Sequence, residues 1–282
     1  MRVLLLGANG QLGSDIVRLW HDPTVSVIPA TRADADVTDA EATRGLISAH
    51  KPDLVINTTA YHNMPAAEAD PETCFRVNVT GGWNIARAAA DAGARVVQIS
   101  TDYVFDGTKR EPYLERDPRR ALNVYGAAKI ATEDVVRIVD PRALIVRVSG
   151  LYGLAGSAGK GGNFVETMLR LAREEKPVRV VSDQVTAPTN TAEIAEALLP
   201  LIRDGAEGVA HVAASDGCNW YEFAAAIFEL AGLRPDFAPT TAAEFGGPVQ
   251  RPAYSVLGST RPIMVGGWRE GLERYMREKH GI

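Results

Sequence analysis

Residues 3–13 read Val-Leu-Leu-Leu-Gly-Ala-Asn-Gly-Gln-Leu-Gly, and this stretch decides the fold. Its apolar start is typical of a buried strand, and residues 11–20 continue with the apolar spacing of a helix. In the turn between them, Gly7 permits a tight bend, Gly10 lets the backbone approach a pyrophosphate, and Gly13 lets the helix pack on the strand. The first N–H groups of the helix would face the anion. The pattern predicts a dinucleotide site formed by Gly7, Asn9, Gly10, Gln11 and Leu12.

The alternation of strand and helix continues through the first half of the chain. Apolar runs at 25–28, 54–56, 96–99 and 144–148 are separated by helical stretches at 40–50, 72–92 and 124–139. Strands that alternate with helices in this way form βαβ units and a parallel sheet. We therefore expect an α/β protein with a Rossmann-type, doubly wound parallel sheet.

After Gly150 the rhythm changes. Residues 151–162 are rich in glycine and serine and predict a loop. Further helices are expected at 164–175, 191–202, 220–231 and 267–279, with a strand at 178–181. We predict an NADP(H)-binding Rossmann domain at 1–150, completed by 176–203. A smaller C-terminal mixed α/β substrate-binding subdomain is expected at 151–175 and 204–282.

The composition is that of an ordinary soluble protein. Of the 282 residues, 46% are hydrophobic and 23% charged, and the net charge of -5 gives no general attraction to nucleic acid or to an anionic membrane. The apolar start stops at Gly7, too early for a signal peptide, and no apolar run could span a bilayer. Cys74 and Cys218 cannot form a disulfide framework, and no Cys/His spacing indicates zinc. We expect a cytoplasmic enzyme without a metal site, and we interpret His21, His50, His211 and His280 as surface residues.

The end of the second strand bears on the choice of dinucleotide. The adenosine ribose is bound there, and the residues are Pro29-Ala30-Thr31-Arg32. No acid stands where it would pair with a free 2′-hydroxyl, whereas Arg32 suits a 2′-phosphate. The sequence therefore favours NADPH, and NADH stays open because Asp34 is close by. Asp36 and Val37 are expected beside the adenine.

Tyr125 and Lys129 lie four residues apart at the start of a predicted helix, so they share one face. A free tyrosine has a pKa of about 10, and a nearby ammonium is expected to lower it. Tyr125 can then give a proton to a carbonyl oxygen as hydride reaches its carbon. Lys129 would also bind the nicotinamide ribose, and Thr101, at the end of the fourth strand, would hold the carbonyl oxygen. Tyr-x-x-x-Lys alone is common on solvated helices, but its place after the fourth strand favours catalysis.

Segments along almost the whole chain resemble one family. The most specific read STDYVFDG at 100–107 and RPAYSVL at 251–257. Further matches are GANGQLG at 7–13, LNVYGAAK at 122–129, NFVETMLRL at 163–171 and DQVTAPT at 183–189. In these segments the chain is similar to extended short-chain dehydrogenases/reductases and, more closely, to the dTDP-4-dehydrorhamnose reductase family. The resemblance implies NADPH-dependent reduction of the 4-keto group of a dTDP-linked 6-deoxy sugar.

The resemblance also implies roles for single residues near the cofactor. Thr101, Tyr125 and Lys129 match the family's catalytic positions. The residues that match the turn lining the cofactor, after the third strand, are Thr59, Ala60 and Tyr61, and Asn78 matches an asparagine that supports this turn.

On the substrate side, Asp102 and Tyr103 match residues that face the sugar. Asn163 and Arg251 are candidates for the nucleotide diphosphate, and the fork of an arginine can donate two bonds to it at once. Extended short-chain reductases are often dimers, so a homodimer is a candidate assembly.

Departures from the family pattern leave the exact sugar open. Residues 64–68 read Met-Pro-Ala-Ala-Glu where Val-Asp-Lys-Ala-Glu is frequent, and Gly150 stands where an aromatic residue is common. We interpret the missing ring as an enlarged pocket wall. The expected substrate is dTDP-4-dehydro-L-rhamnose, reduced to dTDP-L-rhamnose. Two alternatives are a reductase of a different NDP-4-keto-6-deoxy sugar and a non-catalytic, cofactor-binding regulatory subunit; the intact set of Thr101, Tyr125 and Lys129 argues against the second.

Overall fold

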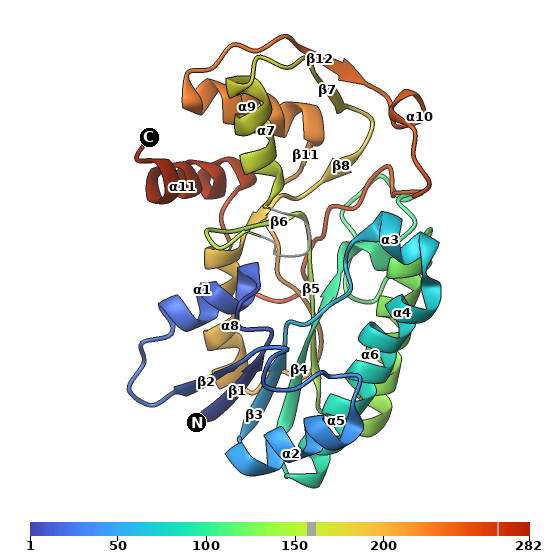
Figure 1. Cartoon of the computed structure of the whole chain (residues 1–282), viewed down its shortest axis with the longest axis vertical. Helices are drawn as coiled ribbons and strands as arrows, with labels where there is room; N and C mark the ends of the chain where they lie inside the picture. Colours follow the sequence, from blue (N-terminus) through green and yellow to red (C-terminus); the bar gives the residue numbers. More distant parts are fainter. Residues whose placement is uncertain (157–161, 264) are drawn as a thin grey trace.

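The computed structural model describes residues 1–156, 162–263 and 265–282. Its centre is a parallel sheet of six strands in the order β2-β1-β3-β4-β5-β10 (Figure 1). The strands are β1 (Arg2–Leu6), β2 (Ser26–Ala30), β3 (Leu54–Asn57), β4 (Arg95–Thr101), β5 (Leu144–Val148) and β10 (Gly208–His211). Every residue of β3 and β5 is buried, which explains why the sequence shows continuous apolar runs there and no alternation. The predicted Rossmann-type α/β class is confirmed.

The strand order reverses next to β1. The chain continues from β1 to β2 on one side and later to β3 on the other, which opens a crevice at the carboxyl ends of these strands. Leu6 lies beside both Ala30 and Asn57, so the three strands end level with one another. The glycine turn after β1 and the turn after β3 therefore flank the place where such sheets bind their ligands.

Helices cover both faces of the sheet. One face packs against α1 (Gln11–Leu19) and α8 (Thr191–Arg203), and the other against α2 (Ala40–His50), α5 (Gly81–Asp91) and α6 (Val124–Val139). Their apolar stripes and the strands between them form two separate cores, one on each face. Within the described ranges, no helix has the length and apolar character needed to cross a membrane.

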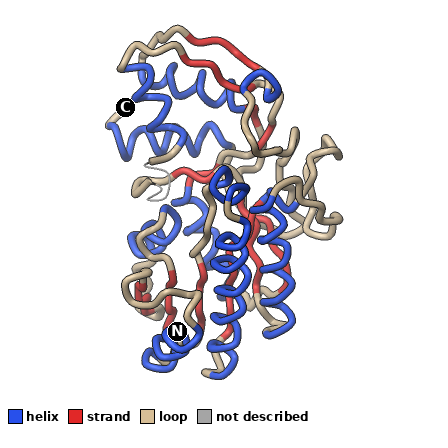
Figure 2. Tube along the Cα trace, turned by 45° about the vertical axis from the view of Figure 1, so that its right-hand side comes forward, coloured by secondary structure: helices blue, strands red, loops and turns tan. Residues whose placement is uncertain are grey.

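A second, smaller part lies beyond the carboxyl ends of the strands (Figures 1 and 2). Its core is built by α7 (Phe164–Arg173), α9 (Trp220–Ala231) and α11 (Trp268–His280), together with the strand pair β7 (Val178–Val181) and β12 (Phe237–Thr240). Shorter elements complete it: β6 (Leu151–Tyr152) pairs with β9 (Thr189–Asn190), β8 (Val185–Thr186) pairs with β11 (Cys218–Asn219), and α10 (Ala242–Phe245) follows β12.

Strand pairing corrects the predicted division of the chain in two places. The sequence assigns 176–203 to the sheet domain. Helix α8 of this segment packs on the sheet, but strand β7 pairs with β12 in the smaller part. The sequence assigns 204–282 to the smaller part, but β10 pairs with β5 and forms an edge of the central sheet. Strands of four residues carry little periodic signal, so their partners cannot be read from the pattern alone.

Two predicted segments also differ in detail. The helix expected at 72–92 is present in three pieces: α4 (Pro71–Phe75), a π-helical turn at Arg76–Thr80, and α5. It is preceded by α3 (Met64–Ala69). The loop expected at 151–162 begins instead with strand β6, and residues 157–161 of that prediction lie outside the described residues.

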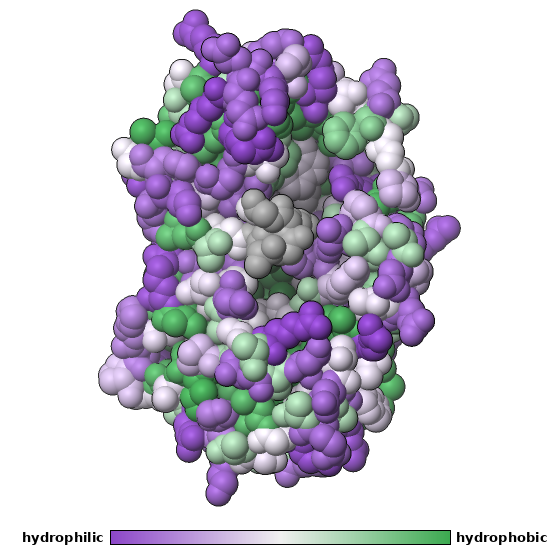
Figure 3. Space-filling model, in the orientation of Figure 1, coloured by the Kyte–Doolittle hydropathy of each residue, from purple (hydrophilic) through white to green (hydrophobic). Residues whose placement is uncertain are grey.

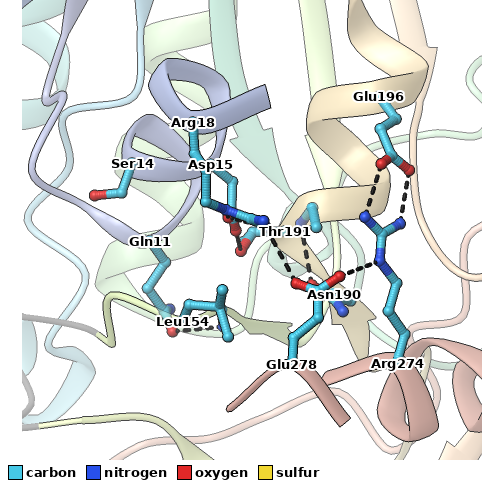
Figure 4. Close-up of polar contacts among 12 residues, drawn as sticks. Gln11, Ser14, Asp15, Arg18, Leu154, Asn190, Thr191, Glu196, Arg274 and Glu278 are labelled. Carbon is cyan, nitrogen blue, oxygen red and sulfur yellow. Dashed lines mark hydrogen bonds and ion pairs between the residues drawn. The ribbon is translucent and has the colours of Figure 1, made fainter. Parts of the chain in front are cut away.

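Ion pairs tie α1 and α8 of the sheet part to α11 of the smaller part (Figure 4). Arg18 of α1 pairs with the buried Asp15 at 2.7 Å and reaches Glu278 of α11 at 3.4 Å. Arg274 of α11 pairs with Glu196 of α8 at 2.7 Å. These contacts join the two parts along the side of the crevice formed by α1.

Candidate active site

The glycine turn after β1 is built so that only glycine fits. Gly7 has a φ of +83°, which favours glycine, and a Cβ there would stand 2.6 Å from Oγ1 of Thr58. A Cβ on Gly13 would collide with the carbonyl oxygen of Gly7. Gly10 is the N-cap of α1 and offers no side-chain cap, so the first N–H groups of the helix stay available to an anion. The turn therefore fits the pyrophosphate of a dinucleotide.

Three neighbours in this turn take different positions. Asn9 is exposed, and Leu12 is buried in the core, so that only its backbone can reach a ligand. The amide of Gln11 accepts a hydrogen bond from the backbone N–H of Gly153 at 3.2 Å and donates to the carbonyl oxygen of Leu151 at 3.5 Å. Gln11 thus ties the glycine turn to β6.

Arg32 follows β2 at the rim of the crevice. Its side chain is 86% exposed and pairs with Asp36 at 2.8 Å. The other oxygen of Asp36 accepts two hydrogen bonds from Thr38, which together with Arg32 hold the pKa of Asp36 below its usual value. Val37 is buried, and its carbonyl oxygen accepts from Asn84 at 3.0 Å. Arg32 is accessible to solvent but bound to Asp36, and its role and that of its two neighbours stay predictions.

The turn after β3 is held by two asparagines. Oδ1 of Asn57 accepts from the N–H of Thr59 at 3.0 Å and from its hydroxyl at 2.6 Å. Asn78, in the π-helical turn, accepts from the N–H of Tyr61 at 3.1 Å and donates to its carbonyl oxygen at 3.2 Å. Asn78 thus binds both backbone groups of Tyr61, and π-helical turns recur at functional sites. A role of Asn78 at the cofactor stays a prediction. Cofactor contacts of Thr59, Ala60 and Tyr61 stay predictions.

Helix α6 is fixed at its first turn by two distant segments. Asn123 caps the helix, and its amide also donates to the carbonyl oxygen of Gln250 at 2.9 Å. Glu68 accepts from the N–H of Val124 at 2.8 Å. The first turn of the helix, which carries Tyr125, therefore has a defined place at the end of the sheet.

Lys129 lies one turn further along the same face. It is 2% exposed, and its Nζ donates to the carbonyl oxygen of Ile99 in β4 at 2.6 Å. Burial lowers the pKa of Lys129 to about 8, and the nearby charge of Glu133 opposes this shift. Its ammonium is therefore fixed next to the strand that ends in Thr101.

Tyr125 meets Thr101 at the end of β4. Their side chains share a hydrogen bond, and the ring of Tyr103 meets that of Tyr125 edge-on with centroids 6.3 Å apart. Burial, and after it the charge of Asp102, raise the pKa of Tyr125. The predicted lowering by Lys129 is wrong here, because that ammonium binds a backbone carbonyl instead. A raised pKa keeps the phenol protonated at neutral pH, which is the form that a proton donor needs.

Arg251 lies next to Gln250, the residue that contacts the cap of α6. Its Nε is buried and has no hydrogen-bond partner in the described part of the chain, and its charge acts on Tyr103. A buried guanidinium nitrogen without a partner suits an anionic ligand. The surface is hollowed between the two parts of the molecule (Figure 3). Among the residues described, no group of three or more His, Cys, Asp or Glu could hold a metal ion.

One family covers the chain from end to end. Residues 1–280 match the model of the RmlD substrate binding domain. The chain belongs to the RmlD substrate binding domain family. It is 38% identical to the spore coat polysaccharide biosynthesis protein SpsK of Bacillus subtilis, over 99% of this chain and 98% of that protein. It is 36% identical to dTDP-4-keto-6-deoxy-D-glucose reductase of Streptomyces niveus, over 95% and 90%.

A solved structure agrees with this membership of the RmlD family. The dTDP-4-dehydrorhamnose reductase of Bacillus anthracis, in complex with NADP, has a TM-score of 0.93 and 34% identity, covering 98% of this chain and 99% of that chain. The resemblance to this family that the sequence segments indicate is confirmed.

Two residues expected at the substrate form hydrogen bonds to other residues of this RmlD-family chain. Asn163 is the N-cap of α7, and its amide nitrogen donates to the carbonyl oxygen of Gly153 and to the hydroxyl of Tyr275, both at 3.1 Å. A diphosphate could bind this amide only if one of these bonds broke. Asp102 is 5% exposed, and hydroxyl groups surround its carboxylate. Direct contacts of Asn163 and Asp102 with a sugar nucleotide stay predictions.

The backbone turns at Gly150 in a conformation that favours glycine. This residue has a φ of +57°, and a Cβ built on it would stand 2.8 Å from Cα of Pro188. The missing side chain would thus point at the backbone of 187–188. The enlarged pocket wall stays a prediction.

Sequence reasoning missed a buried charge pair behind Lys129. Glu133, one turn after it, pairs with Arg147 of β5 at 2.7 Å, and both side chains are 3% exposed or less. Arg147 also contacts Nε2 of His211 at 3.3 Å. His211 is 2% exposed, so its prediction as a surface residue is wrong, because β10 joins the sheet. The signal that could have found Glu133 is its spacing: Tyr125, Lys129 and Glu133 fall at i, i+4 and i+8 on one face.

Proposed function

We propose that this protein uses NADPH to reduce the 4-keto group of a nucleotide-linked 6-deoxy sugar, converting dTDP-4-dehydro-L-rhamnose to dTDP-L-rhamnose. The observation that carries the proposal is the meeting of Thr101, Tyr125 and Lys129 at the end of β4, in the same sheet whose strand β1 leads into the glycine turn. Relatives named for the same class of reaction support it. The direct test follows NADPH oxidation with dTDP-4-dehydro-L-rhamnose, and an absence of turnover with this sugar would contradict the proposal.

NADPH, when bound, supplies the hydride that adds to C4 of the sugar. Tyr125 holds a proton on its phenolic oxygen and gives it to the keto oxygen, which becomes the hydroxyl of the product. Thr101 holds the hydroxyl of Tyr125 in place through their hydrogen bond. Lys129, fixed by its bond to the carbonyl oxygen of Ile99, offers a charged donor to the nicotinamide ribose.

The pKa of Lys129, about 8, predicts an alkaline limit to activity. Below this pH the ammonium is charged, and above it the amine is neutral and loses the charge-assisted bond to the nicotinamide ribose. We expect kcat/KM for NADPH, which reports the free enzyme, to fall about tenfold per pH unit above about pH 8. Tyr125 stays protonated in this range because its pKa is raised. A pH profile between about 6 and 10 measures this, and activity that stays level to pH 10 would contradict it.

Arg32 should set the preference for NADPH over NADH. We expect Arg32→Ala to raise KM for NADPH about tenfold and to change KM for NADH less than about twofold, because only NADPH carries the 2′-phosphate. Arg44→Ala is a matched control, since this arginine is also exposed and paired, at 2.8 Å with Glu41 of α2. Equal effects on both cofactors, or a wild-type preference for NADH, would contradict the role of Arg32.

A second candidate substrate is a different NDP-4-keto-6-deoxy sugar. The relative from Streptomyces niveus is named for dTDP-4-keto-6-deoxy-D-glucose, and the departure at 64–68 begins α3, which packs near α6. A panel of keto-sugar nucleotides, each assayed for kcat/KM, separates the candidates. The first candidate holds if dTDP-4-dehydro-L-rhamnose gives the highest value.

We also propose how the two parts divide the work. The sheet part binds NADPH, because it carries the glycine turn and Arg32, and the smaller part binds the sugar nucleotide together with Arg251. The protein acts in the cytoplasm and assembles as a homodimer. Light scattering on the purified protein measures the assembly.

A further inference from the structure

Asp102 follows Thr101 at the carboxyl end of β4 and carries a buried carboxylate. Its Oδ1 accepts a hydrogen bond from Thr101 at 3.0 Å. Its Oδ2 accepts from Ser255 at 2.6 Å, from Ser149 at 3.0 Å and from Thr186 at 3.5 Å. We call the carboxylate and the four hydroxyl groups around it the Asp102 cage.

The Asp102 cage joins both parts of the molecule. Thr101 is the last residue of β4, and Ser149 follows β5, so both belong to the central sheet. Thr186 lies in β8 and Ser255 in the segment 251–257. The hydroxyls also lie close to one another: the oxygens of Ser149 and Thr186 are 2.8 Å apart, and those of Ser255 and Thr186 are 3.3 Å apart. The position of Asp102 therefore depends on side chains brought together from distant segments.

In the described part of the chain, the side chains that donate to this carboxylate are all hydroxyl groups. Asp102 is buried, with 5% of its surface exposed. None of the ion pairs among the described residues includes it. A buried carboxylate without a cation is stable only when hydrogen-bond donors satisfy its oxygens. Burial raises the pKa of Asp102, and the bonds from Ser255, Ser149 and Thr101 act against this rise. Ser255 makes the shortest of these bonds.

Asp102 controls how the hydroxyl of Thr101 is turned. Thr101 has one hydroxyl proton, and it donates this proton to Asp102. Its oxygen accepts from the N–H of Tyr103 at 3.2 Å and shares a hydrogen bond with Tyr125. If the carboxylate moved, Thr101 would lose the partner that fixes its proton, and Tyr125 would lose a fixed neighbour.

We propose that Ser255 is a positioning residue for the reaction: its hydroxyl holds the carboxylate of Asp102 against Thr101 and so fixes the Thr101–Tyr125 pair. This inference rests on the proposed function, since it assigns the effect of the cage to the proton transfer from Tyr125. It also gives the smaller part of the molecule a direct hydrogen-bonded path to the catalytic side chains.

The test compares Ser255→Ala, Asp102→Asn and the double variant. We expect Ser255→Ala to lower kcat about tenfold and to change both KM values less than about twofold, which corresponds to the loss of one hydrogen bond to a charged group. In the Asp102→Asn background the same change should lower kcat less than about twofold, because Ser255 acts through Asp102. Ser182→Ala, which removes a hydroxyl bonded to the carbonyl oxygen of Thr240 at 3.3 Å, should leave kcat unchanged.

Thermal unfolding and NADPH titration establish that each variant is folded, and Ser149→Ala tests the same cage if Ser255→Ala does not fold. The positioning role is overturned if Ser255→Ala keeps the wild-type kcat, changes only KM for the sugar, or lowers kcat equally in both backgrounds. Turnover by the wild type would then leave the proposed function intact. A wild type without turnover on any keto-sugar nucleotide would instead remove the proposed function, and the positioning role with it.

Discussion

Replacing Tyr125 with phenylalanine should lower kcat about 1,000-fold and leave NADPH affinity almost unchanged. The change removes the phenolic hydroxyl that meets Thr101, while the ring keeps its edge-on contact with Tyr103. The keto oxygen would then have no positioned acid from which to take its proton. Steady-state kinetics measure kcat, and a fluorescence titration measures the affinity for NADPH.

Tyr221→Phe is the matched control for this variant. The ring of Tyr221 stacks on Phe237 in the smaller part, with centroids 4.3 Å apart. Loss of its hydroxyl should leave kcat within about twofold of the wild type. If Tyr125→Phe kept more than about a tenth of the wild-type kcat, another group would have to supply the proton.

Arg147→Met should destabilise the folded protein by about 3–5 kcal/mol, because it leaves a buried carboxylate without its main partner. Arg147 donates to both oxygens of Glu133, at 2.8 Å and 2.7 Å, and the two side chains are 3% and 1% exposed. In the variant, Arg119 remains as a cationic partner of Glu133, at 3.1 Å. Urea unfolding at neutral pH measures the loss.

An exposed ion pair gives the control for this experiment. Arg170 pairs with Glu174 along α7 at 3.1 Å, and their side chains are 56% and 39% exposed. Arg170→Met should barely move the urea midpoint, because water already solvates both groups. Equal shifts for Arg147→Met and Arg170→Met would mean that the buried pair contributes no more than a surface pair.

Local patterns made the fold class and the shared helical face of Tyr125 and Lys129 predictable. The glycine turn lies between a strand and a helix that each have their own periodicity, and Tyr125 and Lys129 share a helical face whatever the rest of the chain does. The same reasoning failed for the pKa of Tyr125. That value depends on where the ammonium of Lys129 points, and the carbonyl oxygen of Ile99, 30 residues away, decides this.

Contacts between distant segments explain the other residues that were missed. Ser255 is separated from Asp102 by 153 positions, and nothing in its neighbourhood of the sequence indicates a carboxylate partner. Asn163 shows a related ambiguity, since an asparagine before a helix can be a cap or a ligand. The structure gives it the cap of α7. Such roles become visible only when the neighbours in space are known.

Helix α8 and strand β10 belong to the sheet part but come after residue 190 of the chain, which has a consequence for engineering. The indole N–H of Trp20, at the end of α1, donates to the carbonyl oxygen of Ala195 in α8 at 2.8 Å, and the last strand of the sheet is formed by Gly208–His211. A fragment cut at residue 150 would lack an edge strand and would expose the apolar side of α1. The two parts are therefore not exchangeable modules, and a chimera that changes the sugar preference must graft loops onto an intact chain.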